Sequence, residues 1–229
     1  MTGQAKCRVG ILGGTFDPVH NGHLGLAAGV RNQFHLDRIL FIPARQSPHK
    51  QGQPLTSSFH RLEMLRRAVS PFPGFQVSDI ELKREGVSYT IDTLDTLGAE
   101  HPRWEFYLIM GADVFEGLST WKDTARLLAM SHIIVAARPG YTLNCMEKTL
   151  KSLSSGAPVL YSPEKREDGT TVFHQGETGT TLSFFNLEPL NISASDIRDR
   201  IRKKREIKNM LPPEVENYIM KNQLYRVES

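Results

Sequence analysis

A glycine pair between an apolar run and a helical pattern constrains the fold of this chain more than any other feature. Residues 7–12 read as a short buried strand, and residues 22–34 follow a helical pattern. Gly13 and Gly14 let the backbone turn sharply between the two and approach a bound group closely. Amides at the start of the helix then face that group, and the helix dipole attracts an anion. The segment therefore predicts a strand–turn–helix unit that binds phosphate.

Two histidines follow this turn. His20 and His23 are three residues apart, so both fall on one side of the first helical turn, where a phosphate would lie. A structural zinc site is disfavoured, because Cys7 and Cys145 have no recognisable ligand spacing. The chain also lacks Gly-x-x-x-x-Gly-Lys-Ser/Thr and Gly-x-Gly-x-x-Gly, which removes support for P-loop ATPases and dinucleotide dehydrogenases.

A second candidate phosphate element lies near the other end of the chain. Ser193, Ser195 and Asp196 are residues typical of helix N-caps, and Arg198 projects from the first turn of the helical run that follows. Hydroxyls, free amides and a guanidinium together suit a triphosphate. The alternative interpretation is an ordinary capped helix with a surface arginine.

Strand-like and helical patterns alternate along the chain. The predicted strands are 8–12, 39–42, 75–78, 106–110 and 133–136, and the predicted helices are 22–34, 57–69, 90–97 and 122–130. This alternation predicts an α/β fold with a Rossmann-like, doubly wound parallel sheet, helices on both faces and ligands at the carboxyl ends of the strands. We expect a single domain over residues 1–229, whose part from about 191 carries the second phosphate element and the closing helices.

Residues 141–179 are polar and rich in turn residues. They predict a helix over 143–153, a strand near Val159 and then an irregular excursion. The closing segment from residue 211 predicts a helix that begins at a proline.

Composition indicates a cytoplasmic enzyme for anionic substrates. The formal net charge is +3, and no apolar stretch approaches the ~20 residues that span a bilayer. Residues 1–6 lack the apolar core of a secretion signal, and two scattered cysteines favour a reducing compartment. The basic run 198–205 complements a helix dipole, so we expect no nucleic-acid partner. The sequence allows a homo-oligomer without specifying its state.

These motifs resemble a known family. The segment His20–His23 matches the His-x-Gly-His signature of the nucleotidyltransferase superfamily, and residues 192–198 resemble its Ile-Ser-Ser-Thr-x-Ile-Arg motif. The full run from Gly13 is similar to the form found in bacterial nicotinate-nucleotide adenylyltransferases. Further blocks of that family occur in order: Ser47–Lys50, Ser88–Thr90, Gly111–Asp113, Trp121 and Val135–Gly140. Ser47 replaces the usual proline, and Ala194 replaces one hydroxyl of the second signature, which puts one phosphate hydrogen bond in doubt.

The resemblance implies an enzyme of NAD biosynthesis that joins ATP and nicotinate mononucleotide to give deamido-NAD and pyrophosphate. It implies catalytic roles for His20, His23, Lys50 and Arg198. The implied ATP-binding residues are Gly13, Gly14, Thr15, Phe16, His20, His23, Gly111, Asp113, Arg138, Ser193, Ser195 and Arg198. The implied mononucleotide-binding residues are Thr15, Lys50, Tyr89, Thr90 and Trp121. Trp121 offers a stacking face to the pyridinium, and Thr90 and nearby amides can receive its carboxylate.

Mg²⁺ is expected as a bridge between the ATP phosphates rather than as an ion held by protein carboxylates. Asp17 either touches the water shell of this ion or shapes the Asp-Pro turn. Two other functions remain open: another small nucleotidyltransferase, such as a phosphopantetheine adenylyltransferase, and a non-catalytic module that binds nucleotide or RNA.

Overall fold

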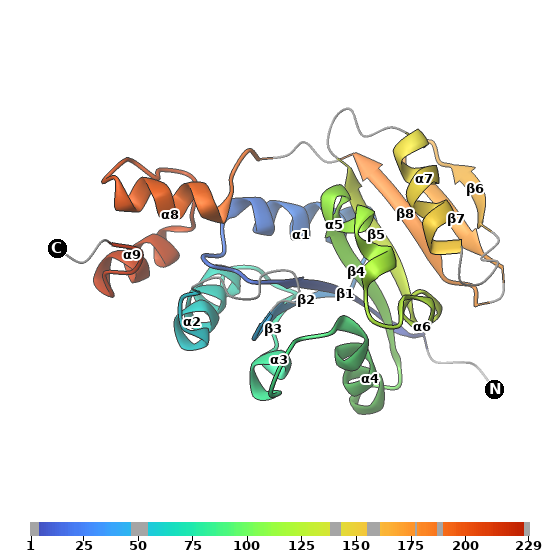
Figure 1. Ribbon diagram of the computed structural model, residues 1–229, viewed down its shortest axis with the longest axis horizontal. Coiled ribbons are helices and arrows are strands. Elements are labelled where there is room, and N and C mark those ends of the chain that lie inside the picture. Colours follow the sequence, from blue (N-terminus) through green and yellow to red (C-terminus); the bar gives the residue numbers. More distant parts are fainter. Residues whose placement is uncertain are drawn as a thin grey trace. The chain divides into compact units, whose positions relative to one another are not determined.

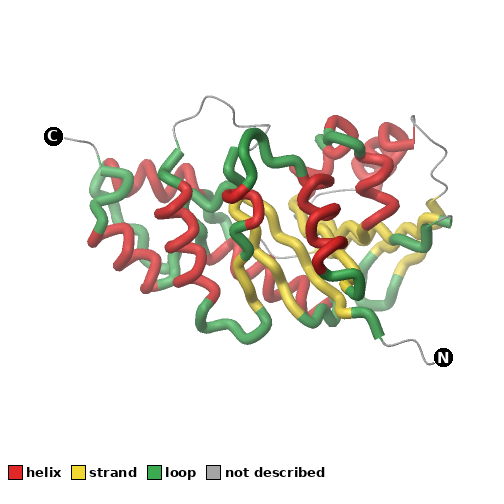
Figure 2. The backbone as a smooth tube through the Cα atoms, turned by 90° about the horizontal axis from the view of Figure 1, so that it is seen from below, coloured by secondary structure: helices red, strands yellow, loops and turns green. Residues whose placement is uncertain are grey.

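A computed structural model describes residues 5–46, 55–137, 143–154, 161–176, 178–186 and 190–226. Ser47, Lys50, Arg138 and Val159 lie outside the described residues, and the expectations for them stay predictions. Helices and strands alternate along most of the chain (Figure 1, Figure 2). In chain order they are β1 (Cys7–Gly14), α1 (Asn21–Gln33), β2 (Arg38–Pro43), α2 (Ser58–Val69), β3 (Phe75–Val77), α3 (Ile80–Lys83), α4 (Thr90–Glu100), β4 (Trp104–Gly111), α5 (Ala112–Glu116), the 3₁₀ helix η2 (Leu118–Thr120), α6 (Thr124–Met130), β5 (Ser131–Ala137), α7 (Leu143–Ser154), β6 (Tyr161–Lys165), β7 (Thr171–Gln175), β8 (Thr181–Asn186), α8 (Ala194–Arg202) and α9 (Pro213–Lys221).

The chain divides into two compact units. Unit 1 comprises Met1–Leu12, Val30–Asp37 and Tyr89–Glu188, and unit 2 comprises Gly13–Gly29, Arg38–Ser88 and Pro189–Ser229. The expectation of one domain over residues 1–229 stays a prediction.

The strands of unit 1 follow one another in the order β1-β4-β5-β8-β7-β6. β1 pairs with β4, β4 with β5 and β5 with β8, all in parallel. These strands are apolar along most of their length, and Ile133, Ile134 and Val135 of β5 are at most 1% exposed. Continuous apolar runs are typical of parallel strands that are covered on both faces. The α/β class with a mainly parallel sheet is confirmed.

The expectation of an irregular segment after α7 is wrong. β6 and β7 form an antiparallel pair, and β7 pairs antiparallel with β8, so the sheet is mixed. Gly169 has a φ of 81° in the turn between β6 and β7, a conformation that favours glycine. The described side chains of β6 are exposed, so this strand lacks the apolar alternation by which strands are predicted. The expected helix over 143–153 is confirmed as α7.

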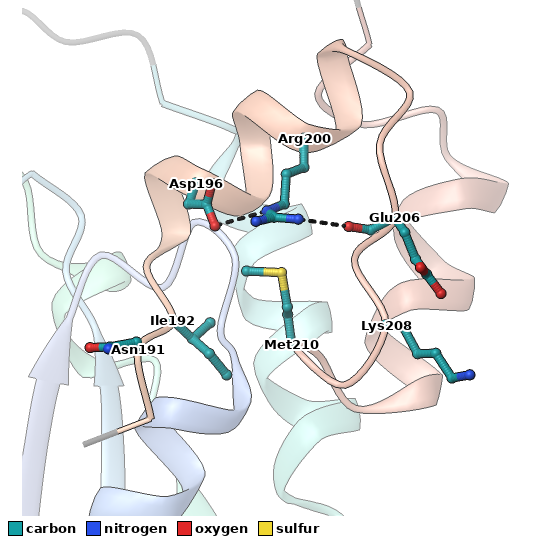
Figure 3. A pocket seen from close by; sticks show the side chains of 7 residues that line it. All are labelled: Asn191, Ile192, Asp196, Arg200, Glu206, Lys208 and Met210. Atoms are coloured by element: carbon teal, nitrogen blue, oxygen red, sulfur yellow. Dashed lines mark hydrogen bonds and ion pairs between the residues drawn. The ribbon is translucent and has the colours of Figure 1, made fainter. Parts of the chain in front are cut away.

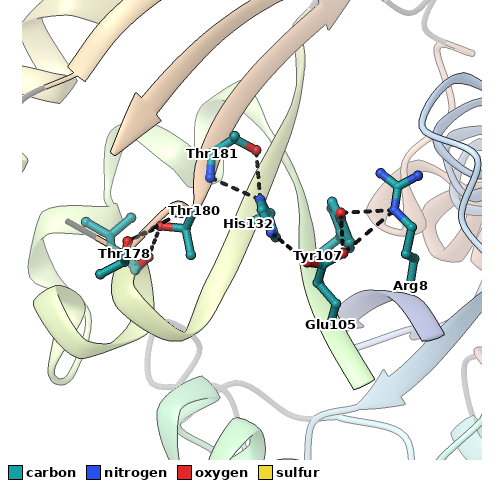
Figure 4. Close-up of polar contacts among 8 residues, drawn as sticks. Arg8, Glu105, Tyr107, His132, Thr178, Thr180 and Thr181 are labelled. Atoms are coloured by element: carbon teal, nitrogen blue, oxygen red, sulfur yellow. Dashed lines mark hydrogen bonds and ion pairs between the residues drawn. The ribbon is translucent and has the colours of Figure 1, made fainter. Parts of the chain in front are cut away.

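A polar cluster joins the first residues of the parallel strands in unit 1 (Figure 4). Arg8 donates through Nε to the Tyr107 hydroxyl at 3.0 Å, and that hydroxyl donates to Glu105 at 2.8 Å. His132 stacks on the Tyr107 ring, with 4.5 Å between ring centroids. Its Nδ1 accepts the amide N–H of Thr181 at 3.0 Å. The cluster therefore links β1, β4, β5 and β8 at the ends of the parallel strands opposite to the glycines that close β1 and β4.

Unit 2 contains β2 and β3, which pair in parallel. Ser57 caps α2 by accepting the amide N–H of His60, and α2 packs against α9. α9 begins at Pro213, as predicted for a helix that starts at proline. Buried apolar side chains of β2, α2 and α9 form the core of this unit: Phe41, Met64, Leu65, Val215 and Ile219. Among the described residues, no helix has the length and apolar character needed to cross a membrane.

Candidate active site

Gly13 and Gly14 are the last residues of β1 rather than the expected turn, and the chain turns after them, before α1. A Cβ on Gly14 would lie 3.0 Å from Cζ of Phe16, so glycine leaves room for that ring. Phe16 has a φ of 50° and is 2% exposed, and its ring meets the His23 ring edge-on at 5.0 Å. A Cβ on Gly13 would meet nothing within 4 Å. Packing therefore explains Gly14, while the approach of Gly13 to a phosphate stays a prediction.

The two histidines lie against each other at the start of α1. Their rings are stacked, with centroids 3.7 Å apart and an interplanar angle of 29°. The amide N–H of His20 donates to Nδ1 of His23 at 3.2 Å. Since Nδ1 of His23 accepts, its proton lies on Nε2, which leaves that nitrogen as a donor. The structure thus brings the predicted pair together.

His20 is neutral at neutral pH. It is 7% exposed, and burial lowers its pKa to about 4. Its Nδ1 is buried and has no hydrogen-bond partner among the described residues. A buried N–H without an acceptor is less well tolerated than an unused lone pair, so we infer that the proton of His20 also lies on Nε2. His20 then offers a hydrogen-bond donor without positive charge.

Gly22 between the histidines lies against the His20 ring. A Cβ at position 22 would lie 3.0 Å from Nδ1 and 3.1 Å from Cε1 of His20. Any larger residue there would have to displace the imidazole. The glycine of the signature therefore allows the ring to pack on the first turn of α1.

We expect the free energy of unfolding of the ligand-free protein to fall as the pH drops from 6.5 towards 4, partly because of His20. The unfolded chain takes up a proton on this side chain near pH 6.5, whereas the folded chain does so only near pH 4. The protonated form is thus disfavoured by folding, and stability is lost as pH decreases, by up to about 3 kcal/mol. Denaturant unfolding at pH 7 and pH 4.5 measures the loss, and His20→Asn should reduce it. An equal loss in this variant and in the parent protein would contradict the assignment to His20.

The second phosphate element is a capped helix, as predicted. Ser193 caps α8: its Oγ accepts the amide N–H of Asp196 at 3.1 Å and lies 3.1 Å from Oγ of Ser195. Both serines are exposed. Arg198 donates from Nη1 to the backbone carbonyl of Asp17 at 2.6 Å. Arg198 of the second signature therefore contacts the loop before the first signature inside unit 2, across 181 positions of the chain.

Asp17 is held by the protein. It is 4% exposed, and its carboxylate accepts the hydroxyl of Tyr225 at 2.7 Å and the amide N–H of Thr56 at 3.3 Å. Both carboxylate oxygens thus have protein donors. These contacts favour a structural role for Asp17 in the turn before His20 over contact with a metal's water shell.

Sequence reasoning missed Arg61, which is buried beneath this loop. Its side chain is 2% exposed and donates to the carbonyls of Thr15 at 2.7 Å, Ala44 at 2.8 Å and Thr56 at 3.0 Å. A signal existed in the sequence, because Arg61 occupies the face of α2 that Met64, Leu65 and Ala68 bury. An arginine at a core position of an amphipathic helix is usually bound to buried acceptors.

A cavity of about 320 Å³ lies beside α8 in unit 2 (Figure 3). It is lined by Asn191, Ile192, Asp196, Arg200, Glu206, Lys208 and Met210. Arg200 donates to the Asp196 carboxylate at 2.9 Å and to the Glu206 carbonyl at 3.3 Å. Arg200 therefore stabilises the end of α8, whereas Arg198 contacts the loop before the histidines.

Three of the residues predicted to bind the mononucleotide, Tyr89, Thr90 and Trp121, belong to unit 1, whereas Thr15 belongs to unit 2. Tyr89 precedes α4 and Thr90 begins it, as expected. Trp121 follows η2 and is half-buried. Lys122 places Nζ 4.8 Å from the centre of the Tyr89 ring and binds both carboxylate oxygens of Asp92, at 2.9 and 3.0 Å. Their contact with a nucleotide stays a prediction.

Gly111 and Asp113, expected on the adenosine side, close β4 and begin α5 in unit 1. A Cβ on Gly111 would lie 2.6 Å from Oδ1 of Asp113. A larger residue at this position would therefore require the flexible Asp113 side chain to shift.

Comparisons with known proteins identify the family of this chain. Residues 11–200 match the cytidylyltransferase-like family model. A Desulfitobacterium hafniense (strain Y51) protein named "Probable nicotinate-nucleotide adenylyltransferase" is 39% identical over 220 residues, which cover 96% of each chain. A Geobacter sp. (strain M21) protein of the same name is 41% identical over 218 residues, 95% of this chain and 98% of its own. The chain belongs to the nicotinate-nucleotide adenylyltransferase family.

A solved structure supports the fold of this family member. The nicotinic acid mononucleotide adenylyltransferase of Plasmodium falciparum, in complex with NaAD, aligns with a TM-score of 0.70 over 95% of this chain and 97% of its own. The two sequences are 21% identical. The nucleotidyltransferase type of fold expected from the sequence is thereby confirmed.

Proposed function

We propose that this chain transfers the adenylyl group of ATP to nicotinate mononucleotide, giving deamido-NAD and pyrophosphate. The observation that carries the proposal is the contact of Arg198 with the loop before the stacked histidines, in a chain of this family. It puts a guanidinium and two imidazoles in the same part of unit 2. Such donors suit a triphosphate better than any uncharged ligand.

The reaction needs no protein nucleophile. The phosphate of the mononucleotide attacks the α-phosphorus of ATP, and pyrophosphate leaves as the bond to the β-phosphate breaks. Catalysis then rests on alignment of the two phosphates and on neutralising charge on the equatorial and leaving oxygens. We assign the Nε2–H groups of His20 and His23 to these oxygens, and Arg198 and the Ser195 hydroxyl to the β- and γ-phosphates. Lys50 would add a movable charge.

Mg²⁺ fits this proposal as an ion carried by ATP. The carboxylate oxygens of Asp17 already accept hydrogen bonds from Tyr225 and Thr56. Among the described residues, no group of three or more His, Cys, Asp or Glu could hold a metal ion. Phosphate oxygens and water are the ligands that Mg²⁺ commonly takes in such sites. Bound there, the ion would neutralise charge on the phosphates.

The direct test measures adenylyl transfer by the purified protein. ATP or CTP is combined in turn with nicotinate mononucleotide, nicotinamide mononucleotide and phosphopantetheine, and pyrophosphate release and product mass are recorded. We expect ATP with nicotinate mononucleotide to give the highest kcat/KM. A preference for phosphopantetheine or for CTP would assign the chain to another nucleotidyltransferase, and the absence of any product would reject the proposal.

Substrate choice provides a separate prediction. We expect the acid to be preferred to the amide, because donors at Thr90 suit a carboxylate, whereas the amide turns an NH₂ group towards them. Mismatched donors cost roughly 10- to 100-fold in kcat/KM per contact. Trp121→Ala should lower kcat/KM for both mononucleotides. Thr90→Val should lower kcat/KM more for the acid than for the amide, and so reduce the preference for the acid. Values of kcat/KM for both mononucleotides check this, and equal use of the two by the parent protein would refute the role of Thr90.

We also place the reaction in the cytoplasm, without a nucleic-acid partner. Two cysteines in 229 residues and a net charge of +3 support this placement. ATP and the mononucleotide are the proposed partners, and a homo-oligomer is compatible with the sequence.

A further inference from the structure

The segment after α9 returns to the loop that precedes the histidines. Tyr225 has a φ of 65°, and its hydroxyl donates to Oδ1 of Asp17 at 2.7 Å. The same hydroxyl lies 3.9 Å from Sδ of Met64 on α2. All three residues belong to unit 2. A side chain close to the end of the chain is thus bonded to the third residue before His20.

Asp17 connects this tyrosine to the proposed phosphate clamp. Its carboxylate accepts the Tyr225 hydroxyl, and its backbone carbonyl accepts Nη1 of Arg198 at 2.6 Å. The amide of Thr56 holds the second carboxylate oxygen at 3.3 Å. Two hydrogen bonds therefore separate Tyr225 from the guanidinium of Arg198.

The arrangement keeps a buried carboxylate away from a neighbouring cation. Asp17 is 4% exposed, and a charge so buried must be hydrogen-bonded or paired. A guanidinium bound to the carbonyl of an aspartate is close to the carboxylate of the same residue, and the two would form a strong bidentate pair. The Tyr225 hydroxyl and the Thr56 amide satisfy the carboxylate instead. Arg198 then keeps its remaining N–H groups for phosphate.

We propose that Tyr225 is a positioning residue for the triphosphate of ATP: its hydroxyl holds the Asp17 carboxylate so that Arg198 stays on the Asp17 carbonyl and remains available to the phosphates. Loss of the hydroxyl lets the carboxylate turn towards Arg198 and withdraw that cation. This inference rests on the proposed function, because it takes ATP to be the ligand of Arg198.

Tyr225→Phe removes the hydroxyl and leaves the ring. Tyr218→Phe is a matched control. Tyr218 lies in the same C-terminal part of unit 2, but its hydroxyl is 2.9 Å from Nδ1 of His60 instead of contacting Asp17. We expect Tyr225→Phe to raise KM for ATP by about 3- to 10-fold, the scale of one lost hydrogen bond, with a smaller change in KM for the mononucleotide. Tyr218→Phe should leave both KM values unchanged. Unchanged kinetics in Tyr225→Phe, or equal rises in both KM values, would overturn the inference.

A second variant separates positioning from general damage to the fold. Asp17→Asn removes the charge that would attract Arg198, so adding Tyr225→Phe to it should raise KM for ATP no further. A full additional rise in this background would overturn the inference. Calorimetric titration with a non-hydrolysable ATP analogue gives the same comparison without turnover. If the parent protein binds the analogue but makes no deamido-NAD, the proposed function fails while the role of Tyr225 is still decided by the binding constants.

Discussion

Alanine in place of His20 or His23 is expected to lower kcat for adenylyl transfer by about 10²-fold or more. Each substitution removes a donor that we assign to charge developing on the transferring and leaving phosphates. KM for the mononucleotide should change much less. Steady-state kinetics of purified variants, with circular dichroism to verify folding, measure both effects.

His60→Ala is the matched control for this experiment. His60 also belongs to unit 2, but its Nδ1 lies 2.9 Å from the Tyr218 hydroxyl and serves the contact between α2 and α9. The control should therefore retain kcat. Near-normal turnover in both folded site variants would eliminate the proposed mechanism.

The stacked geometry also predicts that the two histidine effects do not add. His23 accepts the backbone N–H of His20, and the rings lie 3.7 Å apart, so removing one imidazole releases the other. The double variant should lose less activity than the product of the two single losses.

Arg198→Ala is expected to raise KM for ATP and to slow turnover. The guanidinium would contact the β- and γ-phosphates, which leave together as pyrophosphate. Loss of a charge-assisted contact costs roughly 1.5–3 kcal/mol, which corresponds to about 10- to 150-fold in kcat/KM. Kinetics with ATP varied at saturating mononucleotide, and the reverse, separate the two substrates.

Two variants of the same helix sharpen this result. Arg198→Lys keeps the charge but loses the planar fork, so we expect an intermediate defect. Arg202→Ala removes an exposed cation from the last turn of α8 and should leave both KM values unchanged. An effect of Arg198→Ala on the mononucleotide alone would reverse the assignment of the two ends of the site.

Local sequence signals were sufficient for the elements that carry the site. The start of α4 at Thr90 and the Ser193 cap of α8 depend on neighbouring residues, and the structure confirms both. Their short range is the reason that they could be predicted: a cap or a turn is stabilised within a few positions of the residue that forms it. The predicted turn at Gly13 and Gly14 is wrong in its position, because both glycines belong to β1 and the chain turns after them.

Contacts between distant residues could not be predicted in this way. Tyr225 and Asp17 are 208 positions apart, and no local pattern indicates that they meet. The three carbonyls that bind Arg61 come from the β1–α1 connection and from both ends of the β2–α2 connection, so its role emerges only from the folded chain. The antiparallel pairing after α7 was missed for another reason, because the described side chains of β6 are exposed and give no apolar periodicity.

The polar strand β6 has a consequence for how this protein can associate. It is the last strand in the order of the sheet, and its sequence, Tyr-Ser-Pro-Glu-Lys, places Pro163, Glu164 and Lys165 on an exposed margin. Proline has no N–H to offer an incoming strand, and charged side chains on an edge discourage pairing with another chain. Extension of the sheet through β6 into a second copy is therefore disfavoured, and self-association would have to use another strand edge or a side-chain surface elsewhere on the molecule.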